Sequence, residues 1–227
     1  MRQDASIWLA EAVAVYLKEW RCELRTRYAL NTLGLFAFTT LVVVSLSLGA
    51  EGVSASGPTV LPVLLWVLLL FAITAGLPRG FVHEEETHTA TALRLAATPS
   101  ALFCGKLAYS TSVVLLLELL LTPLFLVMMH LSVESPGLLI LTLLAGGYGL
   151  AAGGTLVAAI IAQARSSGTL FAVLALPVLL PLLVMAIDLT RTAVVGESGG
   201  VALHQLLLYD GTVSVISLML FPAIWNP

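Results

Sequence analysis

The chain has 227 residues, of which 59% are hydrophobic and only 10% are charged, and its mean hydropathy is +1.03. Soluble domains carry charges on about a quarter of their residues, so this composition excludes an ordinary water-soluble protein. The formal net charge is −3, and the charges are gathered in a few segments between long apolar runs, so we expect no nucleic-acid partner.

Six apolar runs are long enough to cross a bilayer, whose hydrocarbon core of about 30 Å needs roughly 20 helical residues. Backbone polar groups in lipid must bond internally, which requires each run to be helical. We therefore predict an all-α membrane protein with six transmembrane helices, at about residues 29–50, 58–78, 106–131, 136–163, 167–187 and 200–225, within a transmembrane domain of residues 29–227. With the N-terminus inside, every Lys and Arg except Arg191 falls on the cytoplasmic side, which predicts two cytoplasmic termini.

The segment before the first run, residues 1–28, is predicted to be an amphipathic helix in the headgroup layer. Apolar residues recur there at spacings of three to five, and basic residues gather on another face. The apolar face comprises Trp8, Val13, Leu17, Trp20 and Leu24, and the basic face comprises Lys18, Arg21 and Arg25. The alternative is a solvated lead-in to the first crossing.

The connection between the second and third runs, residues 79–100, is longer than a hairpin requires. Clustered acids at Glu84 to Glu86 favour the start of a helix through the macrodipole, and Pro99 disfavours helix at Thr98. We therefore predict a short cytoplasmic helix in this segment.

No pattern in the chain supports catalysis. Gly105-Lys106 lacks the upstream glycine and the following Ser or Thr of a phosphate-binding loop, so another chain must hydrolyse any ATP. We expect Lys106 to lie at the headgroups where the third crossing starts. No cysteine or histidine spacing resembles a metal site. The sequence therefore predicts a non-catalytic membrane subunit without a directly bound cofactor or metal.

Glu118 and Asp210 lie near the middle of the third and sixth runs. Insertion scales put the cost of an Asp there at about 2.5–3.5 kcal/mol, and such acids normally face the protein interior. One interpretation is a polar position on the path of substrate or conformational change. The other is a protonated acid bonded to a neighbouring helix, with Tyr209, Thr122 and Ser214 as candidate partners.

Two further patterns concern helix shape and packing. Pro177 and Pro181 each remove an i→i−4 hydrogen bond from the fifth crossing, which predicts either a hinge or a fixed kink. Ala145, Gly149 and Gly153 form a stripe of small residues that permits close helix approach. Packing inside one bundle is the default interpretation of this stripe, and a homodimer face is the alternative.

Several segments, in matching order along the chain, carry a family resemblance. Phe81, the acids Glu84 to Glu86, Thr91-Ala92-Leu93-Arg94-Leu95, Pro99 and Gly105-Lys106 are similar to the coupling segment of type-2 ABC exporter membrane subunits. Residues 176–183, 23–27 and 153–155 are similar to further signatures of the haem exporter protein B (CcmB) family. The chain departs from that family at Ala90, where glycine is usual, and lacks the usual acid after the leucine beside Arg94.

This resemblance implies a membrane subunit of a bacterial inner-membrane ABC complex, homodimeric and paired with the ATPase CcmA. CcmC, CcmD and the haem chaperone CcmE are the further implied partners, with ATP hydrolysis driving release of haem-loaded CcmE and haem as a candidate cargo. The implied ATPase-docking residues are Phe81, Glu84, Glu85, Glu86, Thr91, Leu93, Leu95 and Pro99. Alternatives are a type-2 ABC permease for a drug or lipid-linked glycan, and a proton-coupled carrier using the two intramembrane acids.

With haem as a candidate cargo, His130 and His204 are candidate iron ligands, because both are expected on the outer side and imidazole ligates haem iron. Lone histidines on separate helices are also ordinary at a membrane interface, so both interpretations stay open.

Overall fold

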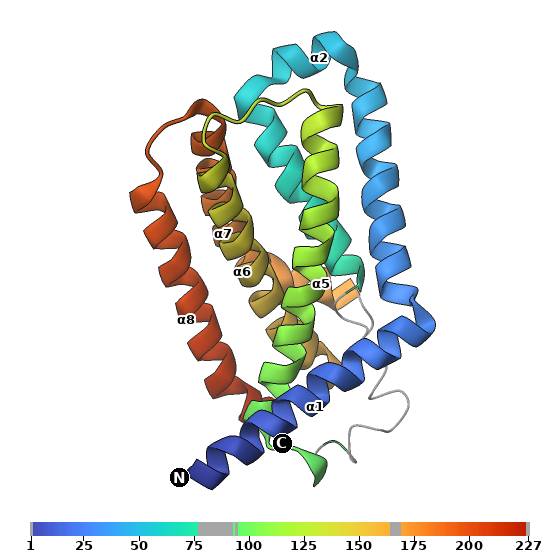
Figure 1. Ribbon diagram of the computed structural model, residues 1–227, viewed down its shortest axis with the longest axis vertical. Coiled ribbons are helices and arrows are strands. Elements are labelled where there is room, and N and C mark those ends of the chain that lie inside the picture. The colour runs from blue at the N-terminus through green and yellow to red at the C-terminus, as the bar shows by residue number, and fades with distance from the viewer. Residues whose placement is uncertain (1, 77–92, 94, 164–168, 226–227) are drawn as a thin grey trace.

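The computed structural model describes residues 2–76, 93, 95–163 and 169–225, and the regular structure in these residues is entirely helical (Figure 1). The all-α prediction is therefore confirmed. The elements are α1 (Arg2–Thr26), α2 (Tyr28–Gly76), α5 (Pro99–Met128), α6 (Pro136–Gln163), α7 (Thr169–Val195) and α8 (Gly200–Trp225). The start of α1 and the end of α8 lie at the same end of the bundle (Figure 1).

Four helices, α5 to α8, are long and apolar enough to cross a membrane. Two of their ends differ from the prediction by more than one helical turn. α5 begins at Pro99 rather than at residue 106, because proline fits the first turn of a helix, where its missing N–H is not needed. α7 ends at Val195 rather than at residue 187, because its apolar face continues through the buried Leu189, Ala193 and Val194.

The first two apolar runs both lie in α2, which folds back on itself at the end of the bundle opposite to the start of α1 (Figure 1). Gly57, near this reversal, has a φ of +48°, in the left-handed region that glycine adopts readily. The described apolar stretches of the two arms, Asn31–Ser47 and Thr59–Thr74, are shorter than those of α5 to α8.

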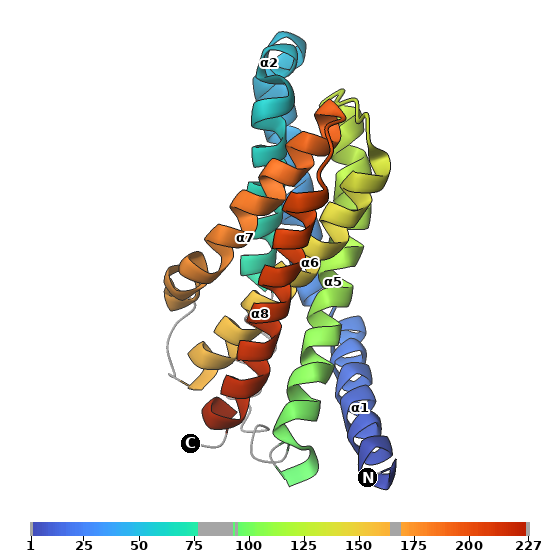
Figure 2. The same cartoon turned by 90° about the vertical axis from the view of Figure 1, so that its left-hand side faces the viewer.

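α6 is the central helix, with α5, α7 and α8 packed around it (Figure 2), and it is more deeply buried than these three neighbours. Glycines make this possible, because side chains of the neighbours occupy the space where a Cβ would stand. Gly146 receives Trp66 of α2, and Gly153 receives Leu179 of α7. Trp66 also donates its Nε1–H to Thr190 Oγ1 of α7 at 2.8 Å.

The predicted stripe of small residues faces the inside of this bundle. Ala145, Gly149 and Gly153 are all buried, and the two glycines contact leucine side chains of α7. Packing within one chain is therefore confirmed for this stripe, and its interpretation as a homodimer face is wrong, because α7 already covers it.

The outer surface of the bundle is apolar. Leu119 and Val127 of α5, Val184 of α7 and Met219 of α8 are all well exposed. A water-soluble monomer rarely exposes so much contiguous apolar surface, whereas helices in contact with lipid require it.

Candidate functional site

α1 lies alongside the first half of α5 (Figures 1 and 2) and contacts α5 far more extensively than any other element. The two helices approach most closely at Gly105 of α5. A Cβ on this glycine would lie 2.6 Å from the backbone oxygen of Ala12 and 2.8 Å from the Cβ of Val15. We call this contact, together with the polar groups on either side of it, the α1–α5 joint. Its residues are Trp8, Glu11, Val15 and Glu19 of α1 and Thr98, Ser100, Gly105 and Lys106 at the start of α5.

Glu11 caps α5 from outside the helix. Thr98 occupies the N-cap position, but its own side chain makes no capping bond. Instead, the backbone N–H and the hydroxyl of Thr98 donate to Glu11 Oε2 at 2.9 and 2.8 Å, and Trp8 Nε1–H donates to Ser100 Oγ at 3.0 Å. Glu11 thereby places a carboxylate at the positive end of the α5 dipole. The backbone bond and then the hydroxyl bond lower the pKa of Glu11.

A buried ion pair forms the other part of the joint. Lys106 Nζ donates to Glu19 Oε1 at 2.8 Å, and Lys18 Nζ donates to the same oxygen at 3.0 Å. Lys106 is only 3% exposed and Glu19 only 7%. Burial by itself raises the pKa of Glu19, but the ammonium groups of Lys106 and Lys18 outweigh it, so the pKa is lowered. α1 covers Lys106, so its ammonium group faces Glu19 rather than solvent, and its depth at the headgroups stays a prediction.

The charged side of α1, rather than its apolar side, faces the protein. Glu19 and Glu23 are buried, whereas Val13, Leu17 and Leu24 of the predicted apolar face are exposed. Trp20, also from that face, is half-buried and packs edge-on against Tyr109 of α5, with ring centroids 5.6 Å apart. A helix in the headgroup layer requires apolar residues on the side that faces away from the protein, as α1 has here. The location of α1 in the headgroup layer stays a prediction.

The joint overlaps the end of the predicted ATPase-docking segment, residues 79–100. Of the predicted docking residues, five lie outside the described part of the chain: Phe81, Glu84, Glu85, Glu86 and Thr91. Among the other three, Leu93 is half-buried and packs against the core, Leu95 is 87% exposed, and Pro99 is the first residue of α5. Thr98, which bonds to α1, therefore lies only three positions after Leu95 in the chain. A displacement of the docking segment would act on these bonds directly.

The two intramembrane acids lie in the interior, each only 3% exposed. They approach α6 from different helices: Glu118 of α5 contacts Gly147, and Asp210 of α8 contacts Gly149. Residues two apart on a helix point about 200° apart, so the acids lie on opposite sides of α6. Neither carboxyl group has a hydrogen-bond partner among the described residues.

The three hydroxyl groups expected as partners of these acids do not bond their carboxyls. Tyr209 donates to the backbone oxygen of Val178 at 2.5 Å. Ser214 Oγ lies 2.8 Å from the Tyr148 hydroxyl and donates to a backbone oxygen of its own helix. Thr122 Oγ1 has no partner in the described chain. This part of the prediction is wrong, because the register of α8 against α7 gives Tyr209 a carbonyl group instead.

Pro177 and Pro181 both lie inside α7 with exposed rings. The Tyr209 bond to Val178 ties this stretch of α7 to α8. It supports the fixed kink, and the hinge stays a prediction.

The two candidate haem ligands are surface residues. His130 lies just beyond α5 with a φ of +47°, His204 lies on α8, and both side chains are exposed. Within the described ranges, no group of three or more His, Cys, Asp or Glu side chains could hold a metal ion. Iron ligation by these histidines therefore stays a prediction.

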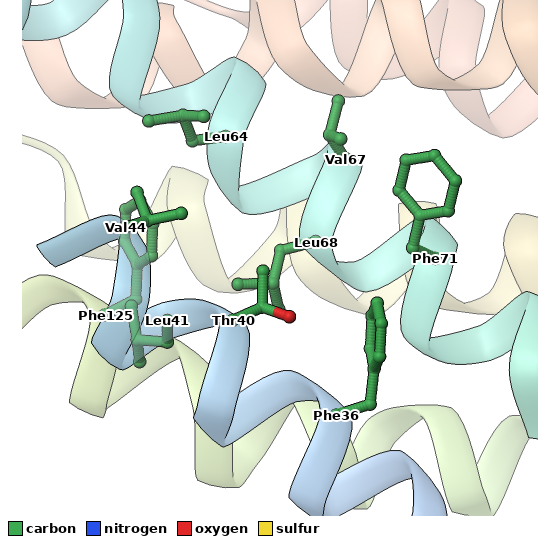
Figure 3. A pocket seen from close by; sticks show the side chains of 9 residues that line it. All are labelled: Phe36, Thr40, Leu41, Val44, Leu64, Val67, Leu68, Phe71 and Phe125. Carbon is green, nitrogen blue, oxygen red and sulfur yellow. The ribbon is translucent and has the colours of Figure 1, made fainter. Parts of the chain in front are cut away.

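A cleft of about 120 Å³ lies between the two arms of α2, next to α5 (Figure 3). Its lining residues are Phe36, Thr40, Leu41, Val44, Leu64, Val67, Leu68, Phe71 and Phe125. None of these side chains is charged or a usual iron ligand, so they provide neither an axial ligand nor a counter-charge for haem.

An apolar outer surface and, among the described residues, four helices of membrane-spanning length are typical of a multi-pass helical membrane protein. The CcmB protein family matches residues 10–224, almost the whole chain, and the chain belongs to this family. It is also 28% identical, over 191 residues and 83% of each chain, to Heme exporter protein B of Bradyrhizobium diazoefficiens (strain JCM 10833 / BCRC 13528 / IAM 13628 / NBRC 14792 / USDA 110). The predicted family is therefore confirmed.

Proposed function

We propose that this chain is the membrane subunit of an ATP-driven ABC complex that handles haem for cytochrome c maturation. The observation that carries this proposal is membership of the CcmB family over residues 10–224, and the name of the relative, Heme exporter protein B, supports haem as the substrate class. A separate CcmA-like subunit hydrolyses ATP. CcmC-like and CcmD-like proteins complete the assembly, and the haem-loaded CcmE-like chaperone is released from it.

In this proposal the chain crosses a bacterial inner membrane six times, with a type-2 exporter architecture and as a homodimer. The two arms of α2 supply the first two crossings, and α5 to α8 supply the other four. Both termini are cytoplasmic, in agreement with the distribution of Lys and Arg. α1 lies in the headgroup layer, where its exposed Arg21 and Arg25 face anionic lipid.

The α1–α5 joint gives this proposal a mechanical step. The ATPase binds the segment of residues 79–100, and its nucleotide-driven movement displaces that segment. Because Glu11 holds Thr98 and Glu19 holds Lys106, α1 and the first turns of α5 move as one unit. Separating them would leave a buried charge without its partner, at a cost of about 3–5 kcal/mol. α5 packs on α6, which brings the movement to the centre of the bundle.

Co-purification tests the docking step. Replacing Glu84, Glu85 and Glu86 together by Lys should release the ATPase subunit while the membrane part stays folded. The matched control reverses three exposed acids away from that segment, Glu134 and Glu197 on connections and Asp188 in α7, and should leave the ATPase bound. One-to-one recovery of the ATPase with the first variant contradicts the proposed docking surface.

A proton-coupled carrier is a second candidate function, favoured by the burial of Glu118 and Asp210 without hydrogen-bond partners in the described chain. Cytochrome c maturation in cells that lack the ATPase subunit decides between the two. Loss of maturation supports ATP coupling, and unchanged maturation supports the carrier.

A further inference from the structure

Many described hydroxyl groups in α5 to α8 bond to their own helix. Seven serine and threonine side chains donate to the backbone oxygen four residues earlier: Ser112, Thr142, Thr190, Thr192, Thr212, Ser214 and Ser217. Thr111 and Thr122 of α5 depart from this pattern, as does Thr155 of α6. The hydroxyl oxygens of these three residues are buried and have no partner among the described residues.

Thr111 and Thr122 share a face of α5 with Glu118. The three residues are separated by seven and four positions, which places them within about 40° of one another around the helix. Along the axis, Thr122 lies about 6 Å from Glu118 and Thr111 about 10 Å on the other side. This face meets α6 at Gly147, where a Cβ would lie 2.6 Å from Glu118 Oε2. This face of α5 therefore contains four buried oxygen atoms without hydrogen-bond partners among the described residues.

No described cation balances Glu118. The only basic residue of α5 is Lys106, 12 residues and about 18 Å along the helix, and it is bonded to Glu19. An ionised carboxylate would be a lone charge in the bundle, so the neutral form is strongly favoured. A neutral carboxyl group offers one O–H donor and keeps acceptor capacity.

Buried polar groups without protein partners are the usual binding sites of internal water, which needs two to four such partners. We propose that the α5–α6 seam binds water at the level of Glu118. Glu118 and Thr122 are one helical turn, about 6 Å, apart along the axis. A neutral Glu118 carboxyl group and the Thr122 hydroxyl can therefore share one water molecule, because each hydrogen bond to it spans about 2.8 Å. Thr111 extends the same site toward the start of α5.

The environment of Asp210 differs, which limits the proposal to Glu118. The two hydroxyl groups expected as its partners, those of Tyr209 and Ser214, already bond to Val178 and Tyr148. Asp210 therefore lacks a second unpaired oxygen on its own helix face with which to share water. The water site does not depend on the proposed function, because it requires no ATPase and no haem.

Infrared spectroscopy of the intact complex in lipid, with ¹³C-labelled glutamate, tests this site. Glu118→Gln should remove one band of a protonated carboxyl group, and in the wild type that band should shift when H₂O is replaced by D₂O. In Thr122→Val the band should move to higher frequency, because the carboxyl group loses its water-bridged partner, and Thr122→Ser should restore it. The control is Thr142→Val, which removes a buried hydroxyl that bonds to Leu138 of its own helix, and should leave the band in place.

Three results would overturn the proposal: no carboxyl band lost in Glu118→Gln, no shift of that band in D₂O, or equal responses to Thr122→Val and Thr142→Val. The first result means an ionised Glu118, and the second means a dry site. The wild-type exchange measurement decides the proposal even if Thr122→Val fails to assemble. If the wild-type complex does not handle haem but its carboxyl band still shifts in D₂O, only the proposed function is contradicted.

Discussion

The two halves of α5 contain buried ionisable groups in opposite circumstances. At the joint with α1, Lys106 lies against Glu19 at 2.8 Å, and Thr98 donates twice to Glu11. In the middle of the same helix, Glu118 has no hydrogen-bond partner among the described residues and lies against a bare glycine. Paired charges fix the position of one helix on another, because any displacement separates them.

An unpaired, neutral acid against a glycine does not impose such a position. α5 therefore has two roles. Its first turns are attached firmly to α1 next to the docking segment, and its middle makes an adaptable contact with α6 at mid-bilayer depth.

Breaking the buried pair should have the largest effect. Lys106→Met leaves Glu19 buried without its main partner, and we expect it to lower the free energy of unfolding by about 3–5 kcal/mol. Lys18→Met is the matched control, because Lys18 contacts the same oxygen but its side chain is 37% exposed, and exposed pairs contribute about 0–1 kcal/mol. Denaturant unfolding in detergent measures both variants. Equal losses in the two variants would show that the buried pair does not hold the joint.

The intramembrane acids should tolerate loss of charge but not loss of polarity. Glu118→Gln and Asp210→Asn keep the shape and some hydrogen-bonding capacity, so both assembly and cytochrome c maturation should persist. Glu118→Leu should weaken assembly by about 1–2 kcal/mol, the scale of a hydrogen bond between membrane helices, because the proposed water molecule loses a partner. Size-exclusion chromatography and a maturation assay report the two properties separately. A fully assembled but inactive Asp210→Asn complex would instead place an ionising acid in the mechanism.

The smallest effect concerns the pH dependence of the joint. The pKa values of Glu11 and Glu19 are lowered, so their contribution is fully present above the ordinary carboxyl pKa and is lost as the pH falls through the lowered values. Acidification below the ordinary glutamate range should therefore speed amide hydrogen exchange at Thr98, after correction for intrinsic rates. Glu11→Gln should show faster exchange already at neutral pH and a flatter profile. Identical pH profiles in the variant and the wild type would exclude Glu11 as the group responsible.

The sequence by itself determined the helical class, the family and the positions of most membrane helices. The predicted crossings at 136–163 and 200–225 coincide with α6 and α8. Lipid requires an uninterrupted apolar helix of fixed length, and this requirement can be read from neighbouring residues alone. The glycines of α6 also indicated close packing correctly, because the absence of a side chain is itself a local property.

Only the tertiary structure decided which side of α1 faces the protein and where Lys106 lies. Of the apolar face predicted from the periodicity of α1, Val13, Leu17 and Leu24 are exposed, whereas Trp8 contacts Ser100 of α5. The protein packs against the acidic side of α1. Lys106 is buried because Glu19, 87 positions earlier in the chain, lies beside it. The environment of a charged side chain depends on which distant element covers it, and no local pattern of residues contains that information.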